Sequence, residues 1–195
     1  MTADRRAQIA AAAAHLFAEH GYAETSMRDI AAAVGMGLGA MYYHIESKEE
    51  LLARIHEEYV GNFAVELERI CARDVPAVDA LVAAGELMMR HLHEYRDHMV
   101  AFFTEQRRIR GDRFAEVAAR RRDVERLLEG LLRRGIAEGA LREHDVRLTV
   151  LAVLGMFNYG HQWYRPDGGR APEEIGRVFI DLLLRGVGAG GQRPE

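Results

Sequence analysis

Residues 25–52, TSMRDIAAAVGMGLGAMYYHIESKEELL, have the pattern of two short helices joined by a tight turn. Ser26 and Asp29 lie three residues apart, which is the spacing of a capping box at a helix start. Gly35 and Gly37 tolerate positive φ angles and predict the turn between the helices. Two short helices in this order predict a helix-turn-helix, whose second helix can enter a DNA major groove.

The second predicted helix, 38–45, has two different faces when its residues are placed 100° apart. The residues expected to face the first helix are Met41, Tyr42 and Ile45. Those expected to face away from it are Gly39, Ala40, Tyr43 and His44. Ser47 and Glu50 form a second capping signal and predict the start of a third helix.

The composition favours an all-α fold. The chain has 195 residues, of which 49% are hydrophobic and 29% charged, and only four prolines. Good helix formers dominate it. We expect nine helices, at about 3–20, 26–34, 38–45, 48–72, 75–94, 96–109, 112–138, 145–164 and 172–186. The segment 145–164 is apolar on nearly every side, which predicts burial in a core or in a subunit interface.

The charge balance limits how such a chain can bind DNA. The net charge is −4, and residues 1–50 carry four basic and seven acidic side chains. A protein that binds nucleic acid through bulk electrostatics is usually basic. We therefore expect a few placed phosphate contacts, the pairing of two copies and a modest dependence on salt.

Several classes of protein are disfavoured by what the sequence lacks. It has no run of eighteen apolar residues and no signal-peptide pattern, so we expect a cytoplasmic protein without membrane contact. Its single cysteine, Cys71, excludes an internal disulfide framework and a Cys-rich zinc site. His91 and His93 are two residues apart and face apart on a helix. Fingerprints of hydrolases, metalloproteases, P-loops and dinucleotide sites do not occur, so we expect no enzyme, cofactor or metal.

Five short segments follow one another between residues 5 and 55: 17–22 (FAEHGY), 25–31 (TSMRDIA), 34–35 (VG), 42–45 (YYHI) and 48–52 (KEELL). In this order and spacing they resemble the TetR family of transcriptional regulators. With the nine expected helices, the resemblance implies a two-domain TetR-like fold, with a DNA-binding domain at 1–47 and an effector-binding and dimerisation domain at 48–189. The glycine-rich end of the chain predicts a disordered tail at 190–195. It also implies a homodimer on a palindromic double-stranded DNA operator, released by a small-molecule effector.

The resemblance places the DNA contacts at Thr25, Ser26, Arg28, Gly37, Leu38, Gly39, Ala40, Tyr42, Tyr43, His44 and Lys48. Thr25 and Arg28 would hold a phosphate at the start of the first short helix, and Lys48 would clamp another. Leu38 and Ala40 would touch thymine methyl groups rather than form bidentate hydrogen bonds. Because residues 37–40 lack the polar side chains that many family members carry, part of the readout would fall to DNA shape.

The segments 103–108 (FTEQRR) and 163–166 (WYRP) resemble family members that regulate fatty-acid, aromatic-acid or sterol catabolism and answer to acyl-CoA thioesters. The expected ligand residues are Met88, Phe102, Phe103, Gln106, Arg107, Met156, Tyr159, Trp163 and Arg165. An apolar tunnel would hold the acyl chain, and arginines would hold the CoA phosphates. Two simpler interpretations stay open, namely that the aromatic and methionine residues form plain core and that the arginines between 107 and 122 form a solvated helix face.

Two other functions remain compatible with the pattern. One is a regulator of the same fold that answers to a drug-like ligand and controls an efflux or antibiotic-related gene. The other is a helical adaptor that does not bind DNA. For the regulator, we expect the helices at 145–164 and 172–186 to form the dimer interface, and a Leu183→Glu variant to be monomeric.

Overall fold

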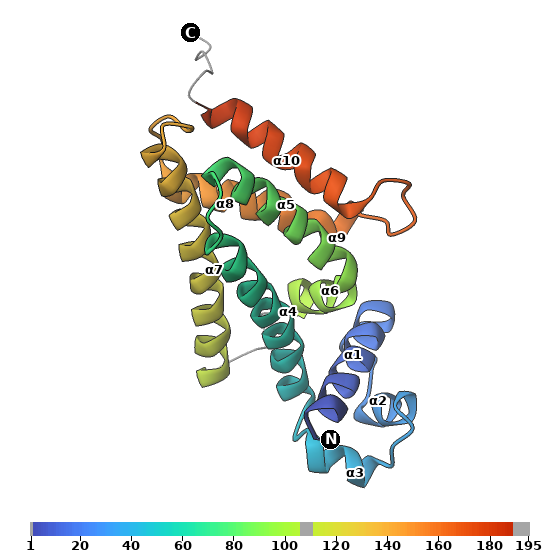
Figure 1. Cartoon of the computed structure of the whole chain (residues 1–195). Helices are drawn as coiled ribbons and strands as arrows, with labels where there is room; N and C mark the ends of the chain where they lie inside the picture. The colour runs from blue at the N-terminus through green and yellow to red at the C-terminus, as the bar shows by residue number, and fades with distance from the viewer. Residues whose placement is uncertain (1, 106–110, 189–195) are drawn as a thin grey trace. The chain divides into compact units, whose positions relative to one another are not determined.

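The computed structural model describes the backbone of residues 2–105 and 111–188 and the side chains of residues 5–105 and 115–188. Within these ranges the chain is helical, apart from turns and one isolated β-bridge between Leu141 and Gly188 (Figure 1). The helices are α1 (Thr2–His20), α2 (Met27–Ala33), α3 (Leu38–His44), α4 (Lys48–Cys71), α5 (Ala77–Glu94), α6 (Arg96–Glu105), α7 (Gly111–Ala137), α8 (Val146–Asn158), α9 (Gly160–Trp163) and α10 (Pro172–Val187). The expected tail at 190–195 lies outside the described residues.

The all-α class and the order of the nine predicted helices are confirmed, with one difference. The helix predicted at 145–164 is divided into α8 and the single turn α9. The backbone at Gly160 lies against Leu92, since a Cβ at Gly160 would be 2.7 Å from the Leu92 Cδ2 atom. The missing side chain at Gly160 therefore lets the backbone pack closely against α5 where the helix is divided. Within the described residues no helix is both long and apolar enough to cross a bilayer.

The chain forms two compact units. The N-terminal unit comprises Met1–Gly61 and Tyr95–Arg120, and the C-terminal unit comprises Asn62–Glu94 and Arg121–Glu195. Helices α4 and α7 each contribute one part to each unit. The DNA-binding domain was expected to end at residue 47. This boundary refers to DNA contacts and not to the limits of the compact units, and it stays a prediction.

The core of the N-terminal unit joins α1, α2, α3, the start of α4 and α6. Ile9, Ile30 and Ile45 are fully buried in it. Phe102 of α6 also belongs to this core, where its ring stacks on His56 with the ring centroids 3.5 Å apart. Because α6 packs against α1, the expected effector segment around residue 102 is part of the same unit as the helix-turn-helix.

The C-terminal unit is organised by a close crossing of α5 and α10. At the crossing Gly85 and Gly176 face each other, and a Cβ on Gly176 would clash with the carbonyl oxygen of Gly85. Ile180 of α10 fills the space beside Gly85. The bare backbones of the two glycines therefore allow the helices to touch directly.

We expect Gly176→Ala to lower the free energy of unfolding by about 1–3 kcal/mol, because the added methyl must push two backbones apart. Gly186→Ala is the matched control on the same helix, since a Cβ there would meet no atom within 4 Å. Urea unfolding of both variants measures the difference. Equal stability of the two variants would contradict the tight crossing.

Candidate nucleic-acid interface

The start of α2 is held by the predicted capping box. The Asp29 backbone N–H donates to Ser26 Oγ at 3.2 Å, and the Ser26 backbone N–H donates to Asp29 Oδ2 at 2.8 Å. The Ser26 hydroxyl donates to the same carboxylate oxygen at 2.7 Å. These hydrogen bonds stabilise the charged carboxylate and hold the pKa of Asp29 below its usual value. The capping box is confirmed, and it fixes where α2 begins.

The turn between α2 and α3 uses only one of its two glycines for a positive φ. Gly35 has φ +65°, which favours glycine, and the next residue, Met36, donates its N–H to the Ala31 carbonyl at 2.8 Å. Gly37 has φ −70° and is the N-cap of α3 without a side-chain cap. The conformation of Gly35 therefore accounts for the reversal, whereas Gly37 leaves the start of α3 open.

Helix α3 buries one face and exposes the other. Met41 and Ile45 are fully buried, as predicted, and Leu38 is half-buried against the same core. Tyr43 is 82% exposed, which agrees with its predicted outward position. Tyr42 was expected to face the first helix, but it is 49% exposed. The core against α3 is filled by Met41 and Ile45, which leaves the Tyr42 ring at the edge.

The remaining residues of α3 lie on or beside this exposed face. Gly39 and Ala40 are exposed, and His44 is half-buried. The His44 ring meets the Tyr43 ring edge-on, with the centroids 5.3 Å apart. The structure thus brings Gly39, Ala40, Tyr42, Tyr43 and His44 together on one short helix.

Thr25 is placed differently from the expected phosphate contact. It is only 3% exposed, and its hydroxyl is oriented toward the carbonyls of Gly21, at 2.9 Å, and Leu16, at 3.3 Å. The side chain therefore anchors the segment between α1 and α2. The hydroxyl is engaged within the chain, and a phosphate contact at Thr25 stays a prediction.

Lys48 also has partners inside the N-terminal unit. Its ammonium group donates to the carbonyls of Thr25, at 2.8 Å, and Tyr22, at 2.5 Å. It also lies 4.1 Å from the centroid of the Tyr22 ring, where a cation is attracted by the ring face. This geometry supports a structural role, tying the segment before α2 to the start of α4, rather than the expected phosphate clamp.

Arg5 has a role that could not be foreseen from the motifs. Its guanidinium donates to the Val34 carbonyl at 3.0 Å and to Gln8 Oε1 at 2.8 Å. Helix α2 has no basic residue in its last turn, so a cation from α1 satisfies its C-terminal end. In the sequence, only the absence of a basic residue near the end of α2 indicated that a cation from elsewhere would be needed there.

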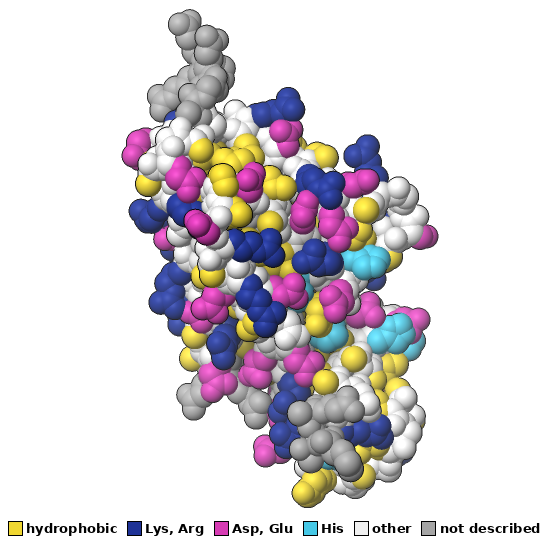
Figure 2. Space-filling view, viewed as in Figure 1, with side chains coloured by type: hydrophobic (Ala, Val, Ile, Leu, Met, Phe, Trp, Pro, Cys, Tyr) yellow, Lys and Arg dark blue, Asp and Glu magenta, His cyan; other side chains and the backbone are white. Residues whose placement is uncertain are grey.

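Basic side chains do not form a continuous region on the visible face of the described residues, where Lys and Arg alternate with Asp and Glu (Figure 2). In the helix-turn-helix itself, Arg28 is exposed on α2 and remains a candidate phosphate contact. With Lys48 and Arg5 engaged internally, few cations of this region are left for DNA. This agrees with the expected modest dependence on salt.

Among the described residues, the expected ligand residues are divided between the two units. Met88 is buried, Met156 is half-buried, and Tyr159, Trp163 and Arg165 are exposed in the C-terminal unit. Phe102 and Phe103 belong to the N-terminal unit. Gln106 and Arg107 lie outside the described residues. Of the seven that the structure describes, Met88 alone lines the apolar cavity described next.

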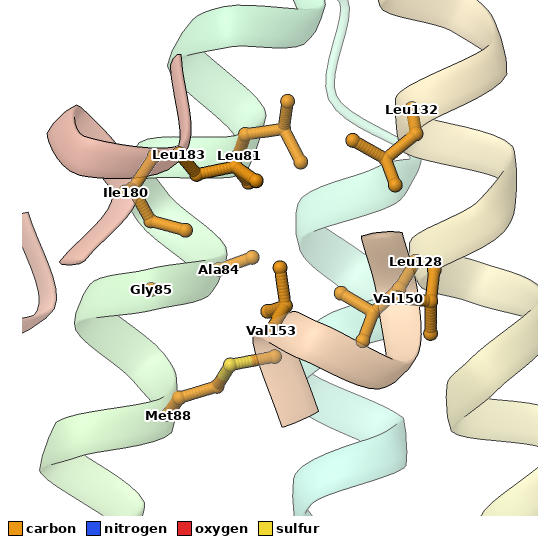
Figure 3. Close-up of a pocket in the computed structure, with 10 residues that line it drawn as sticks. All are labelled: Leu81, Ala84, Gly85, Met88, Leu128, Leu132, Val150, Val153, Ile180 and Leu183. Atoms are coloured by element: carbon orange, nitrogen blue, oxygen red, sulfur yellow. The ribbon is translucent and has the colours of Figure 1, made fainter. Parts of the chain in front are cut away.

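That cavity lies between α5, α7, α8 and α10, and Figure 3 shows side chains from all four helices around it. Its lining is entirely apolar and consists of Leu81, Ala84, Gly85, Met88, Leu128, Leu132, Val150, Val153, Ile180 and Leu183. It offers only about 10 Å³ to the centre of a water molecule, which is about the space that one water occupies. In this state the cavity is closed to an effector.

The outer surface of α8, α9 and α10 carries large apolar side chains that the chain itself does not cover. They are Leu148, Leu151, Tyr159, Trp163, Val178 and Leu182. Leu148 is 63% exposed and Tyr159 is 64% exposed, so the segment 145–164 is not buried all round within one chain, and Leu182 of α10 is 60% exposed. Leu183 is half-buried and lines the cavity, so Leu182, not Leu183, is the outward leucine.

An exposed, tyrosine-bearing second helix on the core of a helix-turn-helix is the arrangement expected of a DNA-binding module, and comparisons with known proteins identify the family. Residues 9–55 match the model described as bacterial regulatory proteins, tetR family. Residues 74–187 match that of the tetracyclin repressor-like C-terminal domain. The chain belongs to the TetR family and is a DNA-binding transcriptional repressor. The family and its relatives are regulators, not enzymes.

Three similar proteins resemble this chain over almost its whole length. The transcriptional repressor KstR2 of Rhodococcus jostii (strain RHA1) is 27% identical, covering 94% of this chain and 91% of that protein. The crystal structure of the TetR family regulator PfmR from Thermus thermophilus is 33% identical with a TM-score of 0.87, covering 95% of this chain and 99% of PfmR. AibR, solved in complex with isovaleryl coenzyme A and operator DNA, is 26% identical with a TM-score of 0.79, covering 95% of this chain and 98% of AibR.

The two cations of the helix-turn-helix are expected to act differently. We expect Lys48→Met to lower the free energy of unfolding by about 1–3 kcal/mol, since two charged hydrogen bonds are lost. Arg28→Met should change stability by less than about 0.5 kcal/mol and weaken DNA binding instead. Chemical unfolding and a mobility-shift titration separate the two effects. A Lys48→Met protein that unfolds like the wild type but binds DNA poorly would restore the phosphate-clamp interpretation.

Proposed function

We propose that this chain represses transcription as a homodimer that places α3 of each copy in successive major grooves of a palindromic operator. We further propose that a lipophilic effector, an acyl-CoA thioester, releases it from DNA. The observation that carries the DNA-binding part is the exposure of Tyr43 beside Gly39 and Ala40, above a fully buried Met41. A large aromatic side chain left in water on a small outer face favours a partner surface outside the chain.

The proposed dimer is supported by the uncovered apolar surface of α8, α9 and α10. Leu148, Tyr159 and Leu182 are more than half exposed there. Apolar side chains gathered in this way on one set of helices mark an interaction surface. A two-fold axis through it would place the same residues of a second copy opposite them.

We expect Leu182→Glu to produce monomers, because the interface would have to bury a carboxylate without a partner. Such monomers should also lose the operator, since a half-site alone provides half of the contacts. Sedimentation velocity and a mobility-shift assay measure the two effects. Val65→Glu is the control, because Val65 is also an exposed apolar residue but lies on α4, which is not part of the proposed interface. A Leu182→Glu protein that stays dimeric would contradict the proposed interface.

The effector class is supported by a relative and by the lining of the cavity. AibR, similar in fold and sequence, was solved with isovaleryl coenzyme A and operator DNA. The cavity beside Met88 has an apolar lining suited to an acyl chain, but it is too small to hold one without movement of α5, α7, α8 or α10. The effector would therefore bind an opened state and shift the population toward it.

Helix α4 is the proposed connection between effector and DNA. Its first part, Lys48–Gly61, belongs to the N-terminal unit and the part from Asn62 to Cys71 belongs to the C-terminal unit. We propose that opening of the cavity acts on the helix-turn-helix through this continuous helix. A hundredfold loss of operator affinity requires a coupling free energy of roughly 2.7 kcal/mol.

Calorimetric titration with acetyl-, isovaleryl-, long-chain acyl- and sterol-ring acyl-CoA thioesters tests the effector, with free CoA and the free acids as controls. We expect at least one thioester to bind and to release the protein from a duplex selected out of a random pool. A Met88→Phe variant, whose ring adds about the volume of the single water that the cavity could hold, should keep the duplex but lose the thioester.

Absence of binding and release with every thioester would overturn the acyl-CoA proposal while leaving DNA binding intact. Release by a drug-like compound instead would favour a regulator of efflux genes. Failure to select any duplex would favour the helical adaptor.

A further inference from the structure

The fold of the chain does not require a glycine at position 39. It lies in the first turn of α3 with an ordinary negative φ, and a Cβ there would have no neighbouring atom within 4 Å. Gly35 differs because its φ is positive, and Gly176 differs because it crosses another backbone. In a helix, glycine is less favourable than alanine. Gly130 of α7 has equally open surroundings, but Gly39 lies on the exposed face of α3, where the missing side chain leaves the backbone accessible to a partner outside the chain.

The side chains around Gly39 indicate what that partner offers. Ala40 is exposed next to it, and Tyr43, one helical turn further on, is 82% exposed. Helix α3 has the sequence LGAMYYH and carries no arginine, lysine, asparagine or glutamine. It therefore lacks the side chains that form bidentate hydrogen bonds with guanine or adenine.

An apolar and almost bare helix face fits one feature of the major groove. Of the four bases, only thymine presents a methyl group there. A methyl group can contact the Cα of Gly39 and the Cβ of Ala40 only if the helix approaches the base edges closely. Any side chain at position 39 would hold the helix away from them.

We propose, building on the proposed DNA-binding function, that Gly39 is a close-approach site for thymine. Its bare backbone and the Ala40 methyl group contact thymine 5-methyl groups, and the Tyr43 ring flanks them. The operator half-site is then recognised chiefly by the positions of its thymine methyl groups. The small number of free cations in the helix-turn-helix agrees with this, because phosphate contacts alone would not hold the protein.

Gly39→Ala separates this role from a structural one. We expect the melting temperature to rise, since alanine stabilises a helix, while affinity for the selected duplex falls at least tenfold. Gly130→Ala is the matched control, because Gly130 is an exposed glycine of α7 with no atom within 4 Å of a Cβ. It should raise the melting temperature without changing affinity. A Gly39→Ala protein that binds like the wild type would overturn the proposal.

The DNA provides the complementary test. The probe is the duplex selected from a random pool, compared with the same duplex in which deoxyuridine replaces thymidine in the half-sites, which removes only the 5-methyl groups. We expect at least tenfold weaker binding to the deoxyuridine duplex. Equal affinity for both duplexes overturns the inference but leaves the DNA-binding function standing. If the pool yields no bound duplex, the proposed function itself fails.

Discussion

Burial of Met41 and Ile45 in the core of the N-terminal unit is the constraint on which the DNA-binding surface depends. A helix of seven residues has few ways to present its sides once Met41 within it and Ile45 at its C-cap are both buried. With these two residues inside, Gly39 and Tyr43 must point outward. The capping box before α2 and the positive φ of Gly35 set the start and the reversal of the motif. Loss of any of these would turn or loosen the one helix that is free to meet DNA.

Close packing also characterises the C-terminal unit. The direct contact of Gly85 and Gly176 brings α5 and α10 together, and the cavity beside them holds no more than about one water. Closely packed helices of this kind resist small deformations and favour a change between discrete arrangements. The apolar outer surface, with Leu182 at its exposed side, lies on the same α10 that contacts α5. A change in the α5–α10 contact and a change in dimer geometry are therefore expected to be linked.

Most of the fold could be predicted from the sequence, because local signals dominate in a helical chain. The spacing of apolar residues and the capping signal at Ser26 led to helices that the structure contains, and the motifs around residues 17–52 led to the correct family. The candidate site was less predictable. Tyr42 is half exposed although its helical angle placed it near the core, because only two of the three inward positions have room to be buried. The positions of the expected ligand residues were also not predicted correctly, since Phe102 packs in the N-terminal core rather than at the cavity.

The sequence alone determined the helix-turn-helix, its turn at Gly35 and the buried face of α3, because each depends on residues within about one or two helical turns of one another. Only the tertiary structure decided the partners of Lys48, whose ammonium reaches a carbonyl 26 residues earlier in the chain. The outward leucine of α10 was decided in the same way. Successive leucines lie 100° apart and cover most of the helix surface, so only the packing of α5 against α10 distinguishes Leu182 from Leu183.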